Sequence, residues 1–296
     1  MEENTVVNVT TSIIESINHI FSNIFSAVDN GIYEILDKIT FIDTEIVEKD
    51  SFVSLFGSSP SSGMLLVCNS LILGIFLFYI ATYLFSHITY TKVQAPLPFI
   101  FKAIIFIALM NNSLWICKEM INIISLISGS ICEIGKSLFG EDISFVHFIT
   151  KINDKIYTSK EVELDVTSFD GIIKTFTTFG FMNLIFSYAL RYIMVQVFVL
   201  LFPFAMLCAI YDKTAWIFKS LMKAFISLLL EQVLVALILV LAFSFSFSPS
   251  NDLSKVLYIG IIYSLMKANT YMYMILGGIS TSITNNVNML SSKGGQ

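Results

Sequence analysis

The chain has 296 residues, of which 55% are hydrophobic and only 13% are charged, and its mean hydropathy is +0.79. Soluble domains carry about 25% charged residues, so this composition excludes an ordinary soluble protein and indicates a polytopic membrane protein. The net charge of -5 argues against extensive wrapping of nucleic acid, which requires a basic surface.

Five long apolar stretches divide the chain, and the segments between them alternate in charge. Segments 1–61 and 118–171 are rich in carboxylates, whereas 87–102 and 211–224 carry mainly lysine. Short loops rich in Lys and Arg stay in the cytoplasm during membrane insertion. The pattern therefore predicts an all-α fold of five transmembrane helices, with the N-terminus outside and the C-terminus inside.

Residues 1–61 are predicted to form an extracytoplasmic N-terminal segment. Within it, apolar side chains recur every three or four residues from 11 to 40, which predicts an amphipathic helix. Its polar face is acidic, whereas a helix lying on anionic lipid would normally carry Lys or Arg there. We favour docking of this helix against protein; a helix resting on the bilayer surface is the alternative.

The next predicted unit, residues 62–139, contains two transmembrane helices and an outer helical extension. The first helix is expected at 64–85 and the second at about 98–117, with apolar periodicity continuing beyond it. Residues 140–174 are the most polar internal stretch and are predicted to form a second extracytoplasmic region.

Residues 175–290 are predicted to hold transmembrane helices three to five, followed by a tail at 291–296. Helix three, 179–210, is unusually long, because an α-helix of that length extends about 48 Å against a hydrocarbon core of about 30 Å. It must tilt, protrude or bend, and Pro203 is the expected kink. Helices four and five are expected at 225–247 and 256–279.

Polar side chains inside the predicted helices are the strongest functional signal. A charged group at the centre of a membrane helix costs about 2.5–3.5 kcal/mol on insertion scales, so it normally faces protein or water. The candidates for an intramembrane structural or channel role are Arg191, Gln196, Glu231, Gln232 and Lys267.

Glu231 and Lys267 are expected to pair, because depth counted along helices four and five places them about 7 Å apart along the membrane normal. The pair either locks two helices together or lines a hydrated passage; snorkelling without a role is the third interpretation.

Arg191 is the only arginine in the chain. Its planar fork of donors suits a clamp between helices that caps carbonyls or a carboxylate, with phosphate recognition as the alternative.

The short cytoplasmic loop 211–224 is the second signal, with Lys213, Trp216, Lys219 and Lys223 as its candidate docking residues. Tryptophan suits the membrane–water boundary, and lysines are attracted to the anionic inner leaflet. Two interpretations are open: a basic helix in the membrane interface, or a docking patch for a cytoplasmic ATPase or for DNA phosphate. In either case Trp216 is expected on the apolar face of this segment.

The sequence contains no motif for enzymatic chemistry. A phosphate-binding loop, a dinucleotide fingerprint and a zinc-protease motif are all missing, and the four cysteines have no metal-like spacing with the three histidines. We therefore expect no catalytic residue, no metal site and no cofactor.

Over most of residues 64–290 the chain resembles the TrbL family, the polytopic inner-membrane subunits of type IV secretion and conjugation machines, which include the sixth VirB subunit. The likeness includes the five expected helices, the outer amphipathic segment and the overlong third helix. It is similar to Gram-positive members in the residues Arg191, Leu200-Leu-Phe-Pro-Phe-Ala205, Asp212-Lys-Thr-Ala-Trp216, Lys219-Ser-Leu-Met-Lys223-Ala, Lys267-Ala-Asn and Gly277-Gly278-Ile-Ser-Thr.

The resemblance implies a non-enzymatic channel or platform component of the bacterial cytoplasmic membrane. Such proteins sit in membrane lipid as oligomers, contact other conjugation-channel subunits and a cytoplasmic ATPase, and contribute to the passage of single-stranded DNA and protein. The alternatives are a small-molecule transporter or permease, and a holin-like pore. Transporters often show internal repeats, and none is visible in this sequence.

Overall fold

The computed structural model describes residues 30–90, 93, 95–156, 169–245 and 252–276. Every regular element in these ranges is an α-helix, as the all-α prediction requires. The helices are α2 (Asn30–Thr40), α3 (Glu45–Glu48), α4 (Asp50–Phe56), α5 (Gly63–Thr89), α6 (Pro96–Asn111), α7 (Ser113–Phe139), α8 (Phe145–Ile156), α9 (Phe169–Ile210), α10 (Ala215–Ser244) and α11 (Asp252–Leu276). Most of the predicted amphipathic helix over 11–40 lies outside the described residues, as does the tail at 291–296.

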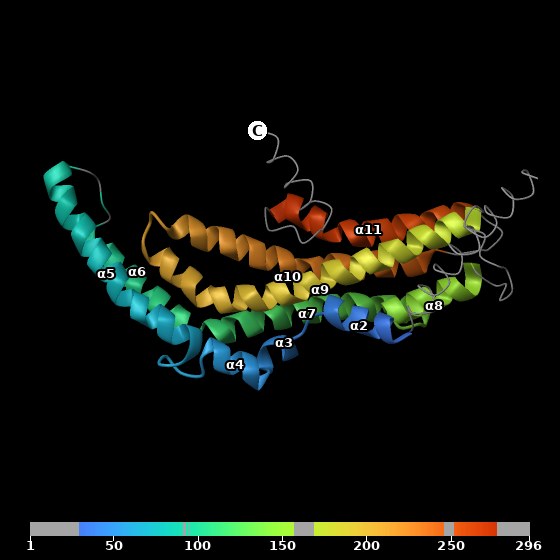
Figure 1. Cartoon of the computed structure of the whole chain (residues 1–296), viewed down its shortest axis with the longest axis horizontal. Helices are drawn as coiled ribbons and strands as arrows, with labels where there is room; N and C mark the ends of the chain where they lie inside the picture. Colours follow the sequence, from blue (N-terminus) through green and yellow to red (C-terminus); the bar gives the residue numbers. More distant parts are fainter. Residues whose placement is uncertain (1–29, 91–92, 94, 157–168, 246–251, 277–296) are drawn as a thin grey trace, which may run out of the picture.

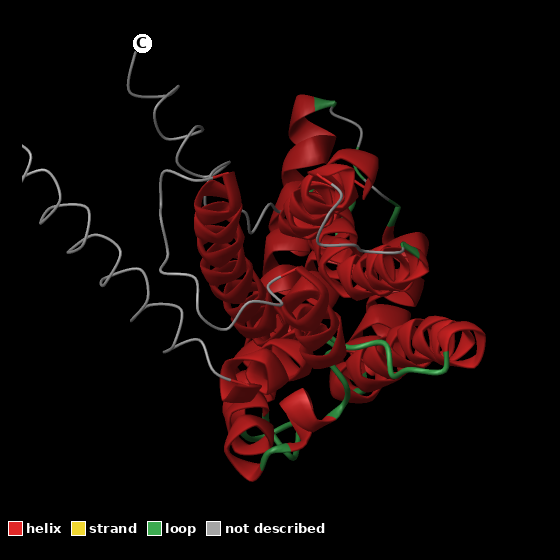
Figure 2. Cartoon of the chain, turned by 90° about the vertical axis from the view of Figure 1, so that its right-hand side faces the viewer, coloured by secondary structure: helices red, strands yellow, loops and turns green. Residues whose placement is uncertain are grey.

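Long helices run side by side along the longest axis of the molecule (Figure 1). α10 is the central one, because it packs against α7, α9 and α11. The α5–α6 pair packs on one end of α9, and α2 and α8 lie toward the other end (Figure 1). Figure 2 views the same bundle from one end and shows the helices gathered around this axis.

Four described helices are long and apolar enough to cross a membrane: Gly63–Thr89, Ser113–Phe139, Phe179–Ile210 and Ala215–Ser244. They confirm a multi-pass membrane protein but not the predicted count of five spans. α6 has only 16 residues, or about 24 Å of helix, against a hydrocarbon core of about 30 Å. α11 is long enough, with 25 residues, but it is not among the four helices that are both long enough and apolar enough.

The second predicted span, 98–117, is not one helix. The chain leaves helical geometry at Asn112, which has φ -100° and ψ 11° and separates α6 from α7. The side-chain amides of Asn111 and Asn112 donate to the carbonyls of Ile107 and Ala108, at 3.0 and 2.9 Å. Such local bonds compete with the helical ladder, and the prediction of a continuous helix is wrong at this point.

α9 is longer than predicted, because it has 42 residues and begins at Phe169. It therefore extends about 63 Å, and its apolar part coincides with the predicted 179–210. The helix is continuous through Pro203, and its last turns bend toward the α5–α6 end of the bundle (Figure 1). α10 begins at Ala215, so the predicted loop 211–224 is a four-residue turn followed by helix.

Buried apolar side chains form two separate cores. The first lies among α3, α4, α5, α6, the start of α7, and the halves of α9 and α10 that adjoin the turn between them. The second lies among α2, α8, α11 and the opposite halves of α9 and α10. Along α9 the first core begins at Val195 and the second ends at Tyr188; along α10 they meet between Leu229 and Val235. The buried residues between these limits are Arg191, Glu231 and Gln232.

Gly135 allows α7 to approach α10 closely. A Cβ atom at Gly135 would lie 2.7 Å from Ile143 Cγ1 and 2.8 Å from Val240 Cγ2, whereas a Cβ atom at Gly129 on the same helix would have nothing within 4 Å. We expect Gly135→Ala to destabilise the folded chain by about 1–3 kcal/mol through overpacking. Gly129→Ala is the matched control, expected to stabilise by up to about 1 kcal/mol through helix propensity. Thermal unfolding in detergent measures both, and equal shifts would contradict the close approach.

Candidate functional site: a buried polar cluster

The region between the two cores is polar. Its main residues are Arg191 on α9 and Glu231 and Gln232 on α10, which are 0%, 0% and 1% exposed. Asn269 of α11 is also buried, and so is the backbone that follows α2. Buried charges persist only where partners compensate for lost hydration, so the contacts of each group define what this cluster does.

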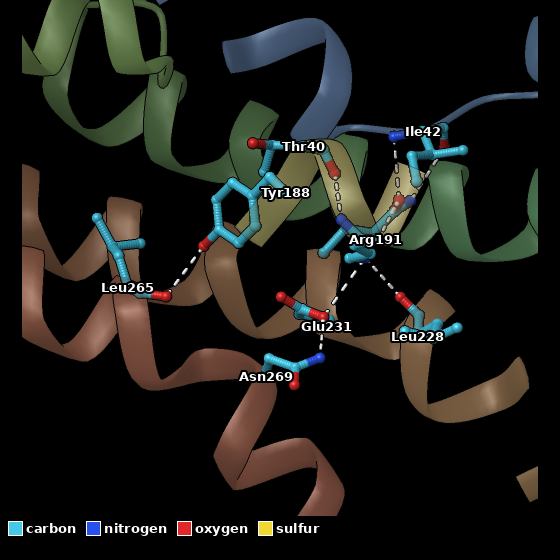
Figure 3. A network of polar contacts seen from close by, with 9 residues as sticks. Thr40, Ile42, Tyr188, Arg191, Leu228, Glu231, Leu265 and Asn269 are labelled. Atoms are coloured by element: carbon cyan, nitrogen blue, oxygen red, sulfur yellow. Dashed lines mark hydrogen bonds and ion pairs between the residues drawn. The ribbon is translucent and has the colours of Figure 1, made fainter. Parts of the chain in front are cut away.

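Arg191 joins three segments of the chain through its guanidinium (Figure 3). Nε donates to Leu228 O on α10 at 2.7 Å, Nη1 donates to Thr40 O at 2.8 Å, and Nη2 donates to Gln232 Oε1 at 3.2 Å. Thr40 is the last residue of α2, whose terminal carbonyls have no partner within the helix and carry its negative dipole end. Arg191 therefore caps α2 and clamps it to α9 and α10.

Glu231 faces Arg191 and α11, and does not contact Lys267. Its Oε2 lies 3.6 Å from Arg191 Nε and accepts a hydrogen bond from Asn269 Nδ2 at 2.8 Å (Figure 3). Lys267 is only partly buried, and its Nζ lies 5.6 Å from the centre of the Tyr263 ring. The predicted Glu231–Lys267 pair is therefore wrong. Positions 267 and 269 are two residues apart along the helix, which turns their side chains roughly 200° apart, so similar depth in the membrane did not mean the same face of α11.

Gln232 binds the backbone of Ile42 as a neighbouring strand would. Its Oε1 accepts from Ile42 N at 3.1 Å, and its Nε2 donates to Ile42 O and to Ser128 Oγ of α7, both at 3.3 Å. Gln196 does the same with one bond, from Nε2 to Ile46 O at 3.0 Å. Both glutamines were predicted as intramembrane polar residues. In the structure both form hydrogen bonds with the backbone of the segment between α2 and α4.

The cluster is suited to holding helices together. Its donors and acceptors join α2, α7, α9, α10 and α11. Among the described residues of the cluster, two buried side-chain oxygens have no hydrogen-bond partner: Glu231 Oε1 and the Thr40 hydroxyl. No group of three or more His, Cys, Asp or Glu residues that could hold a metal ion occurs in the part of the chain that the structure describes. The cysteines at 68, 117, 132 and 208 are free.

The predicted docking residues lie on an exposed basic face at the start of α10. Lys213, Trp216, Lys219 and Lys223 are all exposed, and Trp216 is 65% exposed. The last three are spaced by three and four residues, so they share one side of the helix. Trp216 was expected on the apolar face, but it accompanies the lysines, while Phe218 packs edge-on against Phe106 of α6 at 5.8 Å.

Asp37 makes a contact that the sequence pattern did not reveal. Its carboxylate accepts from Phe145 N at 2.8 Å and Val146 N at 3.3 Å, the first two residues of α8, so α2 caps α8 from a distance of 108 positions. Burial raises the pKa of the Asp37 carboxyl to about 6, and the two backbone hydrogen bonds oppose that rise. In the sequence Asp37 was one of several acids on a polar face, and nothing local distinguished it.

Protein-family models, curated proteins and solved structures gave no match to this chain. The resemblance to the TrbL family therefore rests on the sequence pattern alone.

Proposed function

We propose that this chain is a non-enzymatic membrane component of a type IV secretion machine for conjugative DNA transfer, similar to the TrbL family, and that it acts as an oligomeric platform in the bacterial cytoplasmic membrane. The observation that carries the proposal is the set of hydrogen bonds made by Arg191, which is the first of the residues quoted above as similar to Gram-positive members of that family. This guanidinium is fully buried and its hydrogen bonds fasten α2 to α9 and α10. Such a clamp builds a rigid subunit and leaves the outer surfaces for partners.

A platform fits this geometry better than a permease, the alternative function. Solute carriers place polar groups around a binding site near the bilayer midplane. Cavities of about 470, 250 and 210 Å³ lie beside α7, between α5 and α9, and between α7 and α10, and neither Arg191 nor Glu231 lines any of these. The buried charges therefore favour structural locking over a solute pathway.

The proposed topology places the N-terminal and 140–174 regions outside and the turn 211–214 in the cytoplasm. Two contacts support it, because each joins segments assigned to the same side. Lys102 of α6 forms an ion pair with Asp212, both on the cytoplasmic side, and Asp37 binds the start of α8, both outside. Reporter enzymes fused at Thr150 and Ile217 are expected to be active in opposite compartments. Activity of both fusions in one compartment would exclude this topology.

The outer surfaces offer places for the proposed partners. α5 and α6 expose many large apolar side chains, among them Leu73, Leu84 and Phe101, which suit lipid and contacts with further copies or other channel subunits. The exposed basic face at the start of α10 suits a cytoplasmic ATPase or the phosphates of single-stranded DNA, because both are reached through electrostatic contact.

Deleting the chain from a donor cell is expected to reduce conjugative transfer to the background level, because the transfer channel would lack a structural subunit. Growth and solute uptake are expected to be unchanged, and a second copy of the gene should restore transfer. Mating frequency with a marked plasmid measures the effect. Normal transfer combined with loss of uptake of a solute would favour the permease, and a leak of membrane potential on overproduction would favour the holin-like pore.

The same assay distinguishes loss of the protein from loss of its docking to a cytoplasmic partner. Lys219→Glu combined with Lys223→Glu should lower transfer without changing the amount of chain in the membrane. Lys136→Glu is the matched control, since Lys136 is also exposed and its ion pair with Asp142 lies on the proposed outer side; exposed pairs contribute little to stability. Equal effects of the two changes would contradict docking at the α10 face.

A further inference from the structure

A groove between α5 and α9 contains an apolar cavity of about 250 Å³. One wall is formed by α5 and the other by the end of α9 and the turn that follows it. The lining includes Leu71, Gly74 and Phe78 of α5, Phe204 of α9, and Tyr211 and Thr214 of the turn. An apolar cavity of about 150 Å³ already stays dry and accepts hydrocarbon ligands, so water is a poor occupant for this larger one.

Gly74 keeps the groove open. A Cβ atom at this position would meet nothing within 4 Å, so no neighbouring side chain fills the space beside it. Leu71 and Phe78 on the same wall and Phe204 opposite are 42%, 57% and 37% exposed. Both walls belong to helices that are apolar enough to cross a membrane, and the groove therefore opens toward the acyl chains of the bilayer.

Tyr211 places one polar group in this apolar wall. Its side chain is 5% exposed and packs edge-on against Phe78, with ring centres 5.8 Å apart. Its hydroxyl is buried and has no hydrogen-bond partner among the described residues. Thr214, by contrast, already donates its hydroxyl to Cys208 O at 2.7 Å. A buried hydroxyl normally finds a partner, so the ligand of this groove should carry an acceptor next to its hydrocarbon part.

The charges beside the groove favour an anionic head group. Asp212 follows Tyr211 directly, but it is paired with Lys102. Lys213 is exposed and precedes Thr214 of the cavity wall, so it adds a positive charge that this pair does not neutralise. Tyr211 and Lys213 belong to the same four-residue turn, so a lipid that reaches the unpaired tyrosine hydroxyl can place an anionic phosphate beside this lysine.

We propose that the α5–α9 groove is a binding site for an anionic glycerophospholipid. One acyl chain lies along Gly74 between the two helices, the ester carbonyl accepts a hydrogen bond from Tyr211, and the phosphate lies near Lys213. The site is independent of the proposed role in conjugation, since it follows from the groove and its hydroxyl alone.

The test uses the full chain in nanodiscs that contain a small share of phosphatidylglycerol with a photoactivatable acyl chain. After irradiation, mass spectrometry compares labelling of groove residues with labelling of Leu73 and Ile80, which are exposed on the same helix. We expect the ratio to fall about tenfold in Gly74→Leu, because the added side chain displaces several methylene groups. We expect a fall of about fivefold in Tyr211→Phe, because it removes one hydrogen bond.

Gly260→Leu is the matched control. Gly260 is also an exposed glycine of a long helix with nothing within 4 Å of a Cβ atom, and its replacement should leave the ratio unchanged. If Gly74→Leu fails to fold, the labelling ratio of Tyr211→Phe still tests the proposal. Even labelling of α5 in all four proteins would overturn the site, and absence of lipid adducts in an oligomeric chain would assign the groove to a second copy. Equal labelling by photoactivatable phosphatidylcholine would overturn the role of Lys213.

Discussion

Replacing Arg191 alone by methionine is expected to cost more stability than replacing Arg191 and Glu231 together by methionine and glutamine. The single change leaves the fully buried Glu231 carboxylate without its cation. Removing one partner of a buried ion pair costs about 3–5 kcal/mol, whereas replacing both is often close to neutral. The three hydrogen bonds of Arg191 contribute less, because such bonds inside membrane proteins average about 0.6 kcal/mol each.

Arg191→Met should therefore lower the free energy of unfolding by about 3–5 kcal/mol, and the double variant should recover a large part of that loss. Arg191→Lys is an informative third protein: it keeps the charge but has no fork with which to reach Leu228 and Thr40 together, so an intermediate loss is expected. Thermal unfolding in detergent, with the folded yield from membranes as a second measure, gives the order. Equal losses in the single and double variants would show that the carboxylate does not depend on Arg191.

The sequence predicted the membrane helices better than it predicted their junctions. Hydropathy reported the apolar part of α9 at 179–210 correctly, because twenty or more apolar residues leave few alternatives to a membrane helix. It missed the break at Asn112, because a window average barely changes when two asparagines interrupt an apolar run. The break depends on side-chain bonds from Asn111 and Asn112 to carbonyls one turn earlier, which composition does not register.

The polar cluster was predicted in its members but not in its pairing. Arg191, Glu231 and Gln232 stood out because buried polar groups in apolar helices are rare, and the structure brings these three together. Arg191 and Gln232 also bind backbone atoms of the distant residues Thr40 and Ile42. Backbone acceptors look the same at every position in a sequence, so no residue pattern indicates which ones a distant side chain will reach. The mistaken pair with Lys267 arose from comparing depths alone.

Replacing Gln232 by leucine is expected to release the segment that joins α2 to α4. The change leaves Ile42 N and Ile42 O without the bonds that Gln232 makes to them, and it removes an acceptor from Arg191. An unsatisfied buried polar group costs about 1–3 kcal/mol, so a loss of roughly 2–5 kcal/mol is expected when both backbone groups are exposed to an apolar side chain. Leucine fills much of the same volume, so the effect reports the lost bonds.

Gln196→Leu is the matched control for this prediction, since Gln196 makes a single partly buried bond to Ile46 O and should lose only about 1 kcal/mol. Hydrogen–deuterium exchange over 40–56 in detergent resolves the two, because local opening is seen at the amides that lose protection. Gln232→Leu should speed exchange across α3 and α4 while α10 stays protected, and Gln196→Leu should speed it only near Ile46. If both variants left 40–56 protected, apolar packing of Ile42 and Phe56 in the first core would be sufficient to hold this segment, and the polar cluster would stabilise only the contacts among α9, α10 and α11.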